Sequence, residues 1–360
     1  MRIAIILNSL SSTGTNIATK DFIDQLLKKE DVEISIFSLK PYQKGDLKFE
    51  NVKTFNFFSI IEFRNFEIIY SSTLKSDFYV FLNKNIIRNN GKAVFVTTIH
   101  NIIKEDLNYD YGLFISTIFS KLWIFVKRNN DKVVVSSASM LKHYEKSFDK
   151  SQLNLIEYGR SKVGFPKYEV PLSDIIQISK LKENFTIVGT IGSLIKRKNY
   201  VLVIDLLLKY DHLAWVCLGT GEDEMNLKDL VKENALQNRV LFLGNRSDSR
   251  PYYAFFDFFF HPSRSEGFAL VLIDAMSNKK PILLARLPVY KSILKDDMVF
   301  YFELDNNKSL FDAFDKLIQN RISTNLHVEK AYKIYSNRFS ISTYGKKYSM
   351  LFKTNKKISL

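Results

Sequence analysis

The sequence predicts an α/β protein built from two doubly wound domains. Short apolar runs alternate with segments of helical periodicity, a pattern typical of parallel sheets covered by helices. The 360 residues exceed what one hydrophobic core usually fills, and 46% of them are hydrophobic, enough for two cores. Residues 159–183 contain glycine and prolines with little periodicity and divide the apolar runs into two series. We therefore expect an N-terminal domain over 1–165, a linker over 166–183 and a C-terminal domain over 184–338.

Thirteen apolar runs are the predicted strands. They lie at residues 2–7, 32–37, 52–57, 67–71, 93–98, 132–136 and 153–158, then at 185–190, 215–219, 240–243, 256–260, 281–284 and 299–302. The first run is too short for a signal peptide and polar residues follow it at once, so we interpret it as the first buried strand. In open parallel sheets ligands bind beyond the carboxyl ends of the strands, so the loops after these runs should hold the site.

The net charge of the chain favours anionic binding partners but does not distinguish one kind from another. The formal net charge is +14, from 52 basic and 38 acidic residues, spread over both halves of the chain. Such charge suits nucleic acid, an anionic membrane or an anionic small substrate, and a lysine-rich composition bias explains it equally well. No aromatic-interleaved recognition motif occurs, so we expect no nucleic-acid partner. Cys217 lies in an apolar run; we expect a buried thiol, no disulfide and a cytoplasmic protein.

The segment that is most informative about function lies between residues 261 and 276. Glu266 and Asp274 stand with seven residues between them across a turn that opens a helix, a spacing that fits one ligand contacted at two points. The free backbone N–H groups at a helix start attract phosphate oxygens. A carboxylate, which repels phosphate, is therefore expected to contact a different part of the ligand. Glu266 can accept hydrogen bonds from sugar hydroxyls, and Asp274 can reach a second part of the ligand. The alternative is that Glu266 only caps the helix and Asp274 is solvated.

This segment and its neighbours resemble a known family. The chain reads Val-Leu-Phe-Leu-Gly-Asn from residue 240, His-Pro-Ser-Arg-Ser-Glu-Gly-Phe-Ala from 261 and Asp-Ala-Met from 274. The pattern resembles the C-terminal signature of the retaining glycosyltransferases of family 4, also called group 1. The family usually has Glu where Asp274 stands and Gly where Ala269 stands; aspartate keeps the charge but is one methylene shorter. The resemblance is specific over about residues 185–285 and implies the GT-B fold, two Rossmann-like domains that face a cleft.

The resemblance implies a set of donor-binding residues in the C-terminal domain. Glu266 with Gly267, Phe268 and Ala269 would grip the sugar and diphosphate, Lys198 the phosphates and Asp274 the ribose, while Asn245 and Arg246 would lie at the nucleobase. Lys198 ends a cationic loop that begins at Gly192. The family has arginine where Ser193 stands, so that contact is absent or taken over by Lys196 or Arg197. A solvated basic loop is the alternative.

Further candidates lie in the N-terminal domain. His100 follows the strand predicted at 93–98. A lone histidine is more often structural, but the family commonly has one at this strand end, facing the donor sugar. Thr13, Gly14 and Thr15 resemble the family's acceptor and phosphate loop, although their hydroxyls can cap the next helix equally well. A terminal segment, 339–360, holds a helix that would return to the N-terminal domain, as in relatives.

The absence of metal-binding and ATP-binding motifs limits the reactions that the protein is expected to catalyse. The sequence has no Asp-x-Asp pair, and its histidines lack metal-ligand spacing. We therefore expect no metal and no cofactor besides a UDP- or GDP-linked sugar, with lysine, arginine and a helix start neutralising the leaving diphosphate. Neither a Walker-type loop nor G-x-G-x-x-G follows the first strand, which argues against ATP hydrolysis or a standard dinucleotide site.

The resemblance implies a retaining, metal-independent hexosyl- or N-acetylhexosaminyltransferase. Its acceptor would be a glycan or a lipid-linked sugar, and its pathway the synthesis of a bacterial surface polysaccharide. Two alternatives stay open: a sugar-nucleotide 2-epimerase on the same fold, and a non-catalytic partner subunit of another transferase. Ser193 and Asp274, which depart from the family pattern, keep the second alternative open.

A segment of the N-terminal domain suggests peripheral contact with an anionic membrane, at the inner face of the plasma membrane, where a lipid-linked acceptor would be met. Residues 111–128 combine apolar and basic side chains: Leu113, Phe114, Ile118, Phe119, Leu122, Trp123 and Phe125 with Lys121, Lys127 and Arg128. The apolar stretch is shorter than the ~20 residues that a span needs. A helix packed on the sheet of the domain is equally consistent, and both hold if the basic end is exposed.

Overall fold

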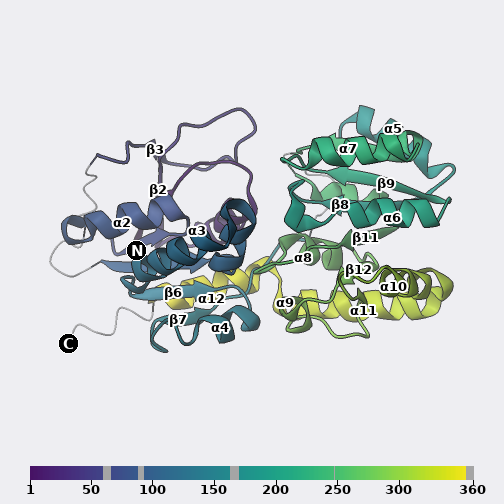
Figure 1. Cartoon of the computed structure of the whole chain (residues 1–360). Helices are drawn as coiled ribbons and strands as arrows, with labels where there is room; N and C mark the ends of the chain where they lie inside the picture. The colour runs from purple at the N-terminus through teal and green to yellow at the C-terminus, as the bar shows by residue number, and fades with distance from the viewer. Residues whose placement is uncertain (60–65, 88–92, 163–169, 247, 354–360) are drawn as a thin grey trace. The chain divides into compact units, whose positions relative to one another are not determined.

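The computed structural model describes residues 1–59, 66–87, 93–162, 170–246 and 248–353. The chain divides into two compact units, Met1–Arg160 with Phe339–Leu360 and Ser161–Arg338. Each unit contains one parallel sheet flanked by helices (Figure 1). These two parallel α/β sheets confirm the predicted fold class.

The N-terminal unit holds a seven-stranded sheet in the order β3-β2-β1-β4-β5-β6-β7, in which every adjacent pair is parallel. Its strands are β1 (Arg2–Leu7), β2 (Glu33–Ser38), β3 (Val52–Thr54), β4 (Ile68–Ser71), β5 (Val94–Ile99), β6 (Lys132–Val135) and β7 (Leu153–Leu155). Its helices are α1 (Gly14–Leu26), α2 (Leu74–Ile87), α3 (Ile103–Arg128), α4 (Ala138–Tyr144) and α12 (Ile341–Lys353). Helices cover both faces of such a sheet, so its central strands are continuous apolar runs.

The C-terminal unit holds a six-stranded sheet in the order β10-β9-β8-β11-β12-β13, also parallel throughout. Its strands are β8 (Thr186–Ile191), β9 (Leu213–Leu218), β10 (Val240–Gly244), β11 (Phe258–His261), β12 (Ile282–Ala285) and β13 (Phe300–Phe302). Its α-helices are α5 (Leu172–Lys182), α6 (Val201–Lys209), α7 (Glu224–Glu233), α8 (Leu270–Ser277), α9 (Pro288–Lys291), α10 (Asn307–Gln319) and α11 (Arg321–Arg338), and its 3₁₀ turns are η2 (Lys196–Lys198), η3 (Gln237–Arg239) and η4 (Arg250–Phe255). The strand order reverses between β8 and β11, the place where open α/β sheets bind ligands.

All thirteen predicted strands are present in the predicted order. Two of them, predicted at 52–57 and 153–158, end after three residues, as β3 and β7. These are the two edge strands of the N-terminal sheet. An edge strand pairs on one side only, so its apolar residues can leave the ladder and still pack on the core, as the buried Phe55 does.

The prediction of a linker over 166–183 is wrong for its second part; residues 163–169 lie outside the described residues. Helix α5 occupies Leu172–Lys182 and starts directly after Pro171, which suits the entry to a helix. The helix buries Asp174 and Ile178, so it is part of the C-terminal unit. Its anchor is a tertiary contact of Asp174, described below, which local periodicity does not reveal.

Helix α12 packs against α1 within the N-terminal unit. The rings of Phe22 and Tyr348 stack with centroids 4.0 Å apart and planes 13° from parallel. Gly345 permits this close approach, because a Cβ there would lie 2.4 Å from Cβ of Gln25. The C-terminal segment is thus part of the core of the N-terminal unit.

Candidate active site

The loops after β8 and β11 meet because these strands are neighbours in the sheet. The cationic loop after β8 ends in the η2 turn, Lys196–Lys198, and the chain turns away through Asn199 in the left-handed conformation (φ 58°). The loop after β11 runs from Pro262 to Ala269, the residue before α8. Arg264 N donates to Arg197 O at 2.9 Å, which joins the two loops directly.

The carboxylate of Glu266 lies between two cations of the cationic loop. Lys198 Nζ donates to Oε1 of Glu266, and Arg197 Nη1 lies 3.5 Å from Oε2. Ser263 Oγ donates to Oε1 at 2.8 Å, and Nε2 of His261 lies 3.3 Å from the same oxygen without the alignment of a hydrogen bond. Glu266 is only 7% exposed. The structure therefore brings together three predicted site residues, Glu266, Lys198 and Arg197.

Two opposing effects act on the pKa of the Glu266 carboxyl. Burial alone would raise it, but the charge of Lys198, with that of Arg197, lowers it well below its usual range. For His261, burial lowers the imidazole pKa more than the contact with Glu266 raises it, and the charge of Lys198 adds to the lowering. At neutral pH the cluster accordingly holds an ionised carboxylate and a neutral imidazole.

Glycines let the loops after β8 and β9 touch. A Cβ at Gly219 (φ 135°) would lie 1.9 Å from the carbonyl oxygen of Gly192, and one at Gly221 would lie 2.2 Å from that of Leu194. Gly192 N donates to Leu218 O at 2.9 Å. The Gly219-Thr220-Gly221 run therefore forms a tight turn, and it supports the cationic loop from the side.

The predicted nucleobase residues follow β10, two strands from β8 and on the same edge of the sheet. Strand spacing places β10 about 10 Å from β8. Arg246 forms a bidentate pair with Asp174 of α5, at 2.7 and 2.9 Å, and Tyr252 Oη donates to the same carboxylate at 2.5 Å. The hydrogen bond from Arg246 lowers the pKa of Asp174. Asn245 is exposed and donates to Thr220 Oγ1 at 2.9 Å.

Asp274 lies in the second turn of α8 and is 3% exposed, so the alternative of a solvated side chain is wrong. Gly267, Phe268 and Ala269 are buried in the turn that leads into this helix. Ala269 is the N-cap, without a side-chain hydrogen bond. The buried, cation-paired Glu266 is likewise more than a capping acid.

His100 directly follows β5 in the N-terminal unit. Its Nδ1 contacts Tyr158 Oη, while its buried Nε2 has no hydrogen-bond partner among the described residues. Burial, with the charge of Lys127, lowers the pKa of the imidazole to about 3. His100 is therefore neutral at physiological pH, and its unpartnered nitrogen can still make a hydrogen bond.

A buried ion pair lies beneath β5. Lys127 Nζ and Asp77 Oδ2 are 2.7 Å apart, with side chains 1% and 0% exposed. Lys127 also donates to Thr97 Oγ1 at 2.8 Å and Thr98 O at 3.0 Å, and Trp123 Nε1 donates to Asp77 at 2.8 Å. Lys127 and Trp123 therefore face the core, and the prediction that they belong to an exposed basic and apolar face is wrong. At positions i and i+4 they share the inner face of α3.

The predicted acceptor loop is arranged around the start of α1. Thr13 is the N-cap, and its Oγ1 accepts from Asn16 N at 3.4 Å and lies 3.0 Å from Thr15 Oγ1. Asn16 Nδ2 donates to the carbonyls of Ser9 and Ser11, both at 2.9 Å. The capping role is thus confirmed for Thr13, and a role in acceptor binding stays a prediction for Thr13, Gly14 and Thr15.

Four residues around Glu266 were not singled out from the sequence: Ser263, His261, Tyr200 and Tyr290. Ser263 and His261 lie within the quoted His-Pro-Ser stretch, where their spacing to Glu266 is a usable signal. Tyr200 follows the cationic loop, and Tyr290 lies in α9, far from Glu266 along the chain. Only the strand order brings α9 to the site.

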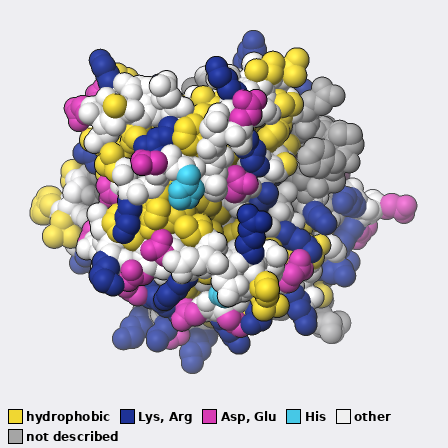
Figure 2. Space-filling model, turned by 90° about the vertical axis from the view of Figure 1, so that its right-hand side faces the viewer, with side chains coloured by type: hydrophobic (Ala, Val, Ile, Leu, Met, Phe, Trp, Pro, Cys, Tyr) yellow, Lys and Arg dark blue, Asp and Glu magenta, His cyan; other side chains and the backbone are white. Residues whose placement is uncertain are grey.

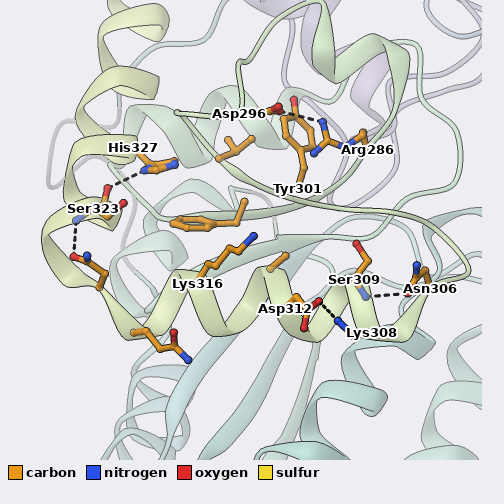
Figure 3. A pocket seen from close by; sticks show the side chains of 15 residues that line it. Arg286, Asp296, Tyr301, Asn306, Lys308, Ser309, Asp312, Lys316, Ser323 and His327 are labelled. Atoms are coloured by element: carbon orange, nitrogen blue, oxygen red, sulfur yellow. Dashed lines mark hydrogen bonds and ion pairs between the residues drawn. The ribbon is translucent and has the colours of Figure 1, made fainter.

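A cavity of about 760 Å³ lies elsewhere in the C-terminal unit, along β13 and between α10 and the start of α11 (Figure 3). None of its lining residues is a predicted site residue. Its charged groups largely pair with one another, as Arg286 does with Asp296 at 3.1 Å and Lys308 with Asp312 at 2.7 Å. It offers no group of side chains set for chemistry.

On the face shown in Figure 2, lysine and arginine side chains alternate with acidic ones, so the positive charge does not gather into one patch there. Within the described residues, no group of three or more His, Cys, Asp or Glu side chains is placed to hold a metal ion. Among those same residues, no helix has the length and apolar character needed to cross a membrane. Cys217 is buried, as predicted.

The two parallel α/β sheets, one of them with a cation-paired glutamate at its strand ends, have the architecture of the GT-B fold. Residues 173–334 match the family model of the glycosyl transferases group 1. This match confirms the resemblance that the sequence motifs indicated, and it assigns the matched segment to the group 1 glycosyltransferases.

Relatives and solved structures agree with this assignment. An O-antigen biosynthesis glycosyltransferase of Escherichia coli, WclY, is 28% identical over 98% of both chains. A Campylobacter jejuni N-acetylgalactosaminyltransferase that acts on a diphospho-undecaprenol-linked sugar is 31% identical over 44% of this chain and 41% of its own length. In fold, the chain is similar to Anabaena HepE in complex with UDP-glucose, with a TM-score of 0.80, 18% identity and coverage of 98% and 100%.

Proposed function

We propose that the protein transfers a hexosyl or N-acetylhexosaminyl group from a UDP- or GDP-linked donor to a glycan or lipid-linked acceptor, with retention of anomeric configuration. The pathway we propose is the synthesis of a bacterial surface polysaccharide, which the O-antigen relatives support. The observation that carries the proposal is the buried carboxylate of Glu266 between Lys198 and Arg197 at the carboxyl edge of a parallel sheet.

In this proposal the donor lies along the strand ends of the C-terminal unit. Glu266, ionised because of its low pKa, accepts hydrogen bonds from sugar hydroxyls. Lys198 and Arg197 share their charge between Glu266 and the diphosphate, and the Gly267–Ala269 turn adds backbone N–H groups. Asp274 binds the ribose, while Asn245 and the guanidinium of Arg246, fixed by Asp174, lie at the nucleobase.

The proposed transfer needs only the donor and the acceptor as reactants. The bond from the anomeric carbon to the diphosphate oxygen breaks, and the bond from the acceptor oxygen to that carbon forms on the same face. The acceptor's proton passes to the departing phosphate oxygen. Lys198 and Arg197 stabilise the negative charge that develops there. His100, neutral and with an unpartnered Nε2, lies near the reacting centre in this proposal, and Thr13–Thr15 contact the acceptor.

A panel of UDP- and GDP-linked sugars tests the proposal. The purified protein is incubated with each donor, with and without lipid-linked and soluble glycan acceptors, and released nucleotide is measured. Release that depends on an acceptor supports transfer. Epimerised donor without any acceptor requirement would favour the 2-epimerase alternative, and no release with any donor would favour a non-catalytic partner subunit.

We further propose that α3 attaches the protein to an anionic membrane surface that carries the acceptor. Gly112 (φ 78°) interrupts the helix, and seven large apolar side chains are exposed beyond it: Leu113, Phe114, Ile115, Ile118, Phe119, Leu122 and Phe125. No acidic residue occurs over 113–128, and Lys121 and Arg128 are exposed. Exposed apolar patches of this kind mark interaction surfaces, and the basic flank favours anionic lipid.

Co-sedimentation with vesicles tests this attachment. We expect recovery of the wild-type protein with phosphatidylglycerol-containing vesicles to exceed recovery with neutral ones, and Phe114→Ser with Phe119→Ser to abolish it. The control is Ile322→Ser, because Ile322 is equally exposed, at 77%, but lies in the other unit. Equal recovery with neutral and anionic vesicles would contradict the electrostatic part, and binding by the double variant would contradict the whole surface.

A further inference from the structure

Four buried polar atoms around Glu266 have no hydrogen-bond partner among the described residues. They are Tyr200 Oη, Tyr290 Oη and both ring nitrogens of His261. The three side chains are at most 1% exposed. Buried polar groups in folded proteins are almost always hydrogen-bonded, so several unpartnered ones in one place need an explanation.

These side chains surround the carboxylate from different elements. His261 Nε2 lies 3.3 Å from Glu266 Oε1, and the Tyr290 ring lies edge-on to the His261 ring at 5.9 Å. Tyr200 reaches under the cationic loop: a Cβ at Gly192 would lie 2.8 Å from Tyr200 Oη and 3.8 Å from Cε of Lys198. Burial and then the charge of Glu266 raise the pKa of Tyr290, which also indicates that the two groups are close.

Their chemistry complements a carboxylate. Each tyrosine hydroxyl donates one hydrogen bond, and a neutral imidazole donates from one nitrogen and accepts at the other. A buried water molecule needs two to four polar partners, and these groups with Glu266 supply that number. A buried hydroxyl without any partner would destabilise the fold, so a bridging water is the partner that the geometry favours.

We propose that Tyr200, Tyr290 and His261 are positioning residues for Glu266. Through buried water they hold the carboxylate in the orientation in which it accepts sugar hydroxyls, and none of the three touches the substrate. The inference rests on the role proposed for Glu266. It extends the site to three side chains that lie beneath the donor-binding surface.

Single-oxygen deletions test the positioning role. For Tyr290→Phe and Tyr200→Phe we expect kcat to fall about tenfold, the range of coupling between residues in one hydrogen-bond network, with donor KM and affinity for the free nucleoside diphosphate unchanged. We expect Tm to fall less than in the control variant below, because each hydroxyl hydrogen-bonds to buried water rather than to another part of the chain. His261→Phe should lower kcat similarly, and His261→Asn should restore part of it, since an amide also donates and accepts.

The control is Tyr301→Phe, a buried tyrosine of the same unit whose hydroxyl is satisfied by Leu294 O at 3.2 Å. We expect this variant to lose stability and keep its activity. In a Glu266→Gln background, the effect of Tyr290→Phe on kcat should disappear if the hydroxyl acts through the carboxylate.

Several results would overturn the inference. Full activity of Tyr290→Phe and Tyr200→Phe, while Glu266→Gln is inactive, would sink the positioning role and leave the proposed function intact. A fall of Tm and kcat in parallel would assign the tyrosines a merely structural role. Full activity of Glu266→Gln would remove both the inference and the proposed role of Glu266.

Discussion

A lysine–carboxylate pair in the N-terminal unit, Lys127 with Asp77, and one in the C-terminal unit, Lys198 with Glu266, differ in how their surroundings are satisfied. Asp77 in the N-terminal unit accepts from Lys127, Trp123, Ser71 and Thr97, all between 2.7 and 2.9 Å. Glu266 in the C-terminal unit is paired with Lys198 but lies among polar atoms that lack partners within the described part of the chain. The first pair is closed and fixes α3 to β5, whereas the second keeps hydrogen-bonding capacity. From this difference we expect the first pair to be structural and propose that the second is functional.

Breaking the closed pair should give the largest effect on stability. Lys127→Met leaves the Asp77 carboxylate buried without its cation, which typically costs about 3–5 kcal/mol of unfolding free energy. Urea unfolding followed by circular dichroism measures it. Lys121→Met on the exposed side of the same helix is the control, expected within about 0.5 kcal/mol of wild type. Equal midpoints for the two variants would contradict the structural reading of the Asp77 pair.

Breaking the open pair should affect catalysis instead. For Lys198→Ala and Glu266→Ala we expect turnover to fall a hundred- to thousandfold, about 2.7–4 kcal/mol, by analogy with the loss of one oxyanion donor. The variants should remain folded, because Arg197 and Ser263 still contact the Glu266 carboxylate when Lys198 is removed, and both mutated side chains lie on loops at strand ends. Lys196→Ala, in the same η2 turn but exposed, is the matched control and should keep most activity. More than about a tenth of wild-type turnover in either site variant would show that the site is misplaced.

How far the sequence predicts this architecture depends on whether a signal is local. Strands such as β1 and β9 are predictable because strands buried on both faces are continuous apolar runs. Helix α5 is missed because it is fixed by Arg246, which contacts Asp174 across 72 positions of sequence. The same limit applies to Lys127 and Trp123, whose inward direction depends on Asp77.

In the candidate site, too, local motifs are predictable from the sequence and tertiary contacts are not. Glu266 and Lys198 are identified from motifs, but their contact follows from the adjacency of β8 and β11, which the sequence does not show. Tyr290 joins them only through the position of α9, after the neighbouring strand β12. Site residues in the loop after a single strand are therefore predictable from the sequence. Contacts between residues that follow different strands are not.

Acid should weaken the N-terminal unit through His100. Its pKa is lowered to about 3, mainly by burial, whereas the unfolded chain titrates near 6.5. Between these values the unfolded state binds a proton that the folded state does not, so the contribution to stability is complete above pH 6.5 and is lost as pH falls toward 3. At pH 5 the pKa difference corresponds to a loss of at most about 2 kcal/mol of unfolding free energy. We expect a smaller loss, because the half-buried residue is partly screened by solvent. Unfolding curves of wild type and His100→Gln at pH 7 and pH 5 measure it, and equal pH slopes would contradict the burial of the imidazole.

The smallest expected effect is that of a chelator. We expect transfer to persist unchanged in excess EDTA, because the sequence has no Asp-x-Asp pair and Lys198 with Arg197 supplies charge for the diphosphate.

The same cluster of charged residues favours a mechanism in which the acceptor attacks on the leaving-group face, so that the anomeric configuration is retained. A double displacement needs a carboxylate free to attack the sugar, as in retaining hydrolases with carboxyl groups about 5–5.5 Å apart. Glu266 is paired with two cations and assigned to sugar hydroxyls, and Asp274 is assigned to the ribose. Proton NMR of the fresh product determines the anomer, and an inverted linkage, or activity that returns only with added manganese or magnesium, would refute this mechanism.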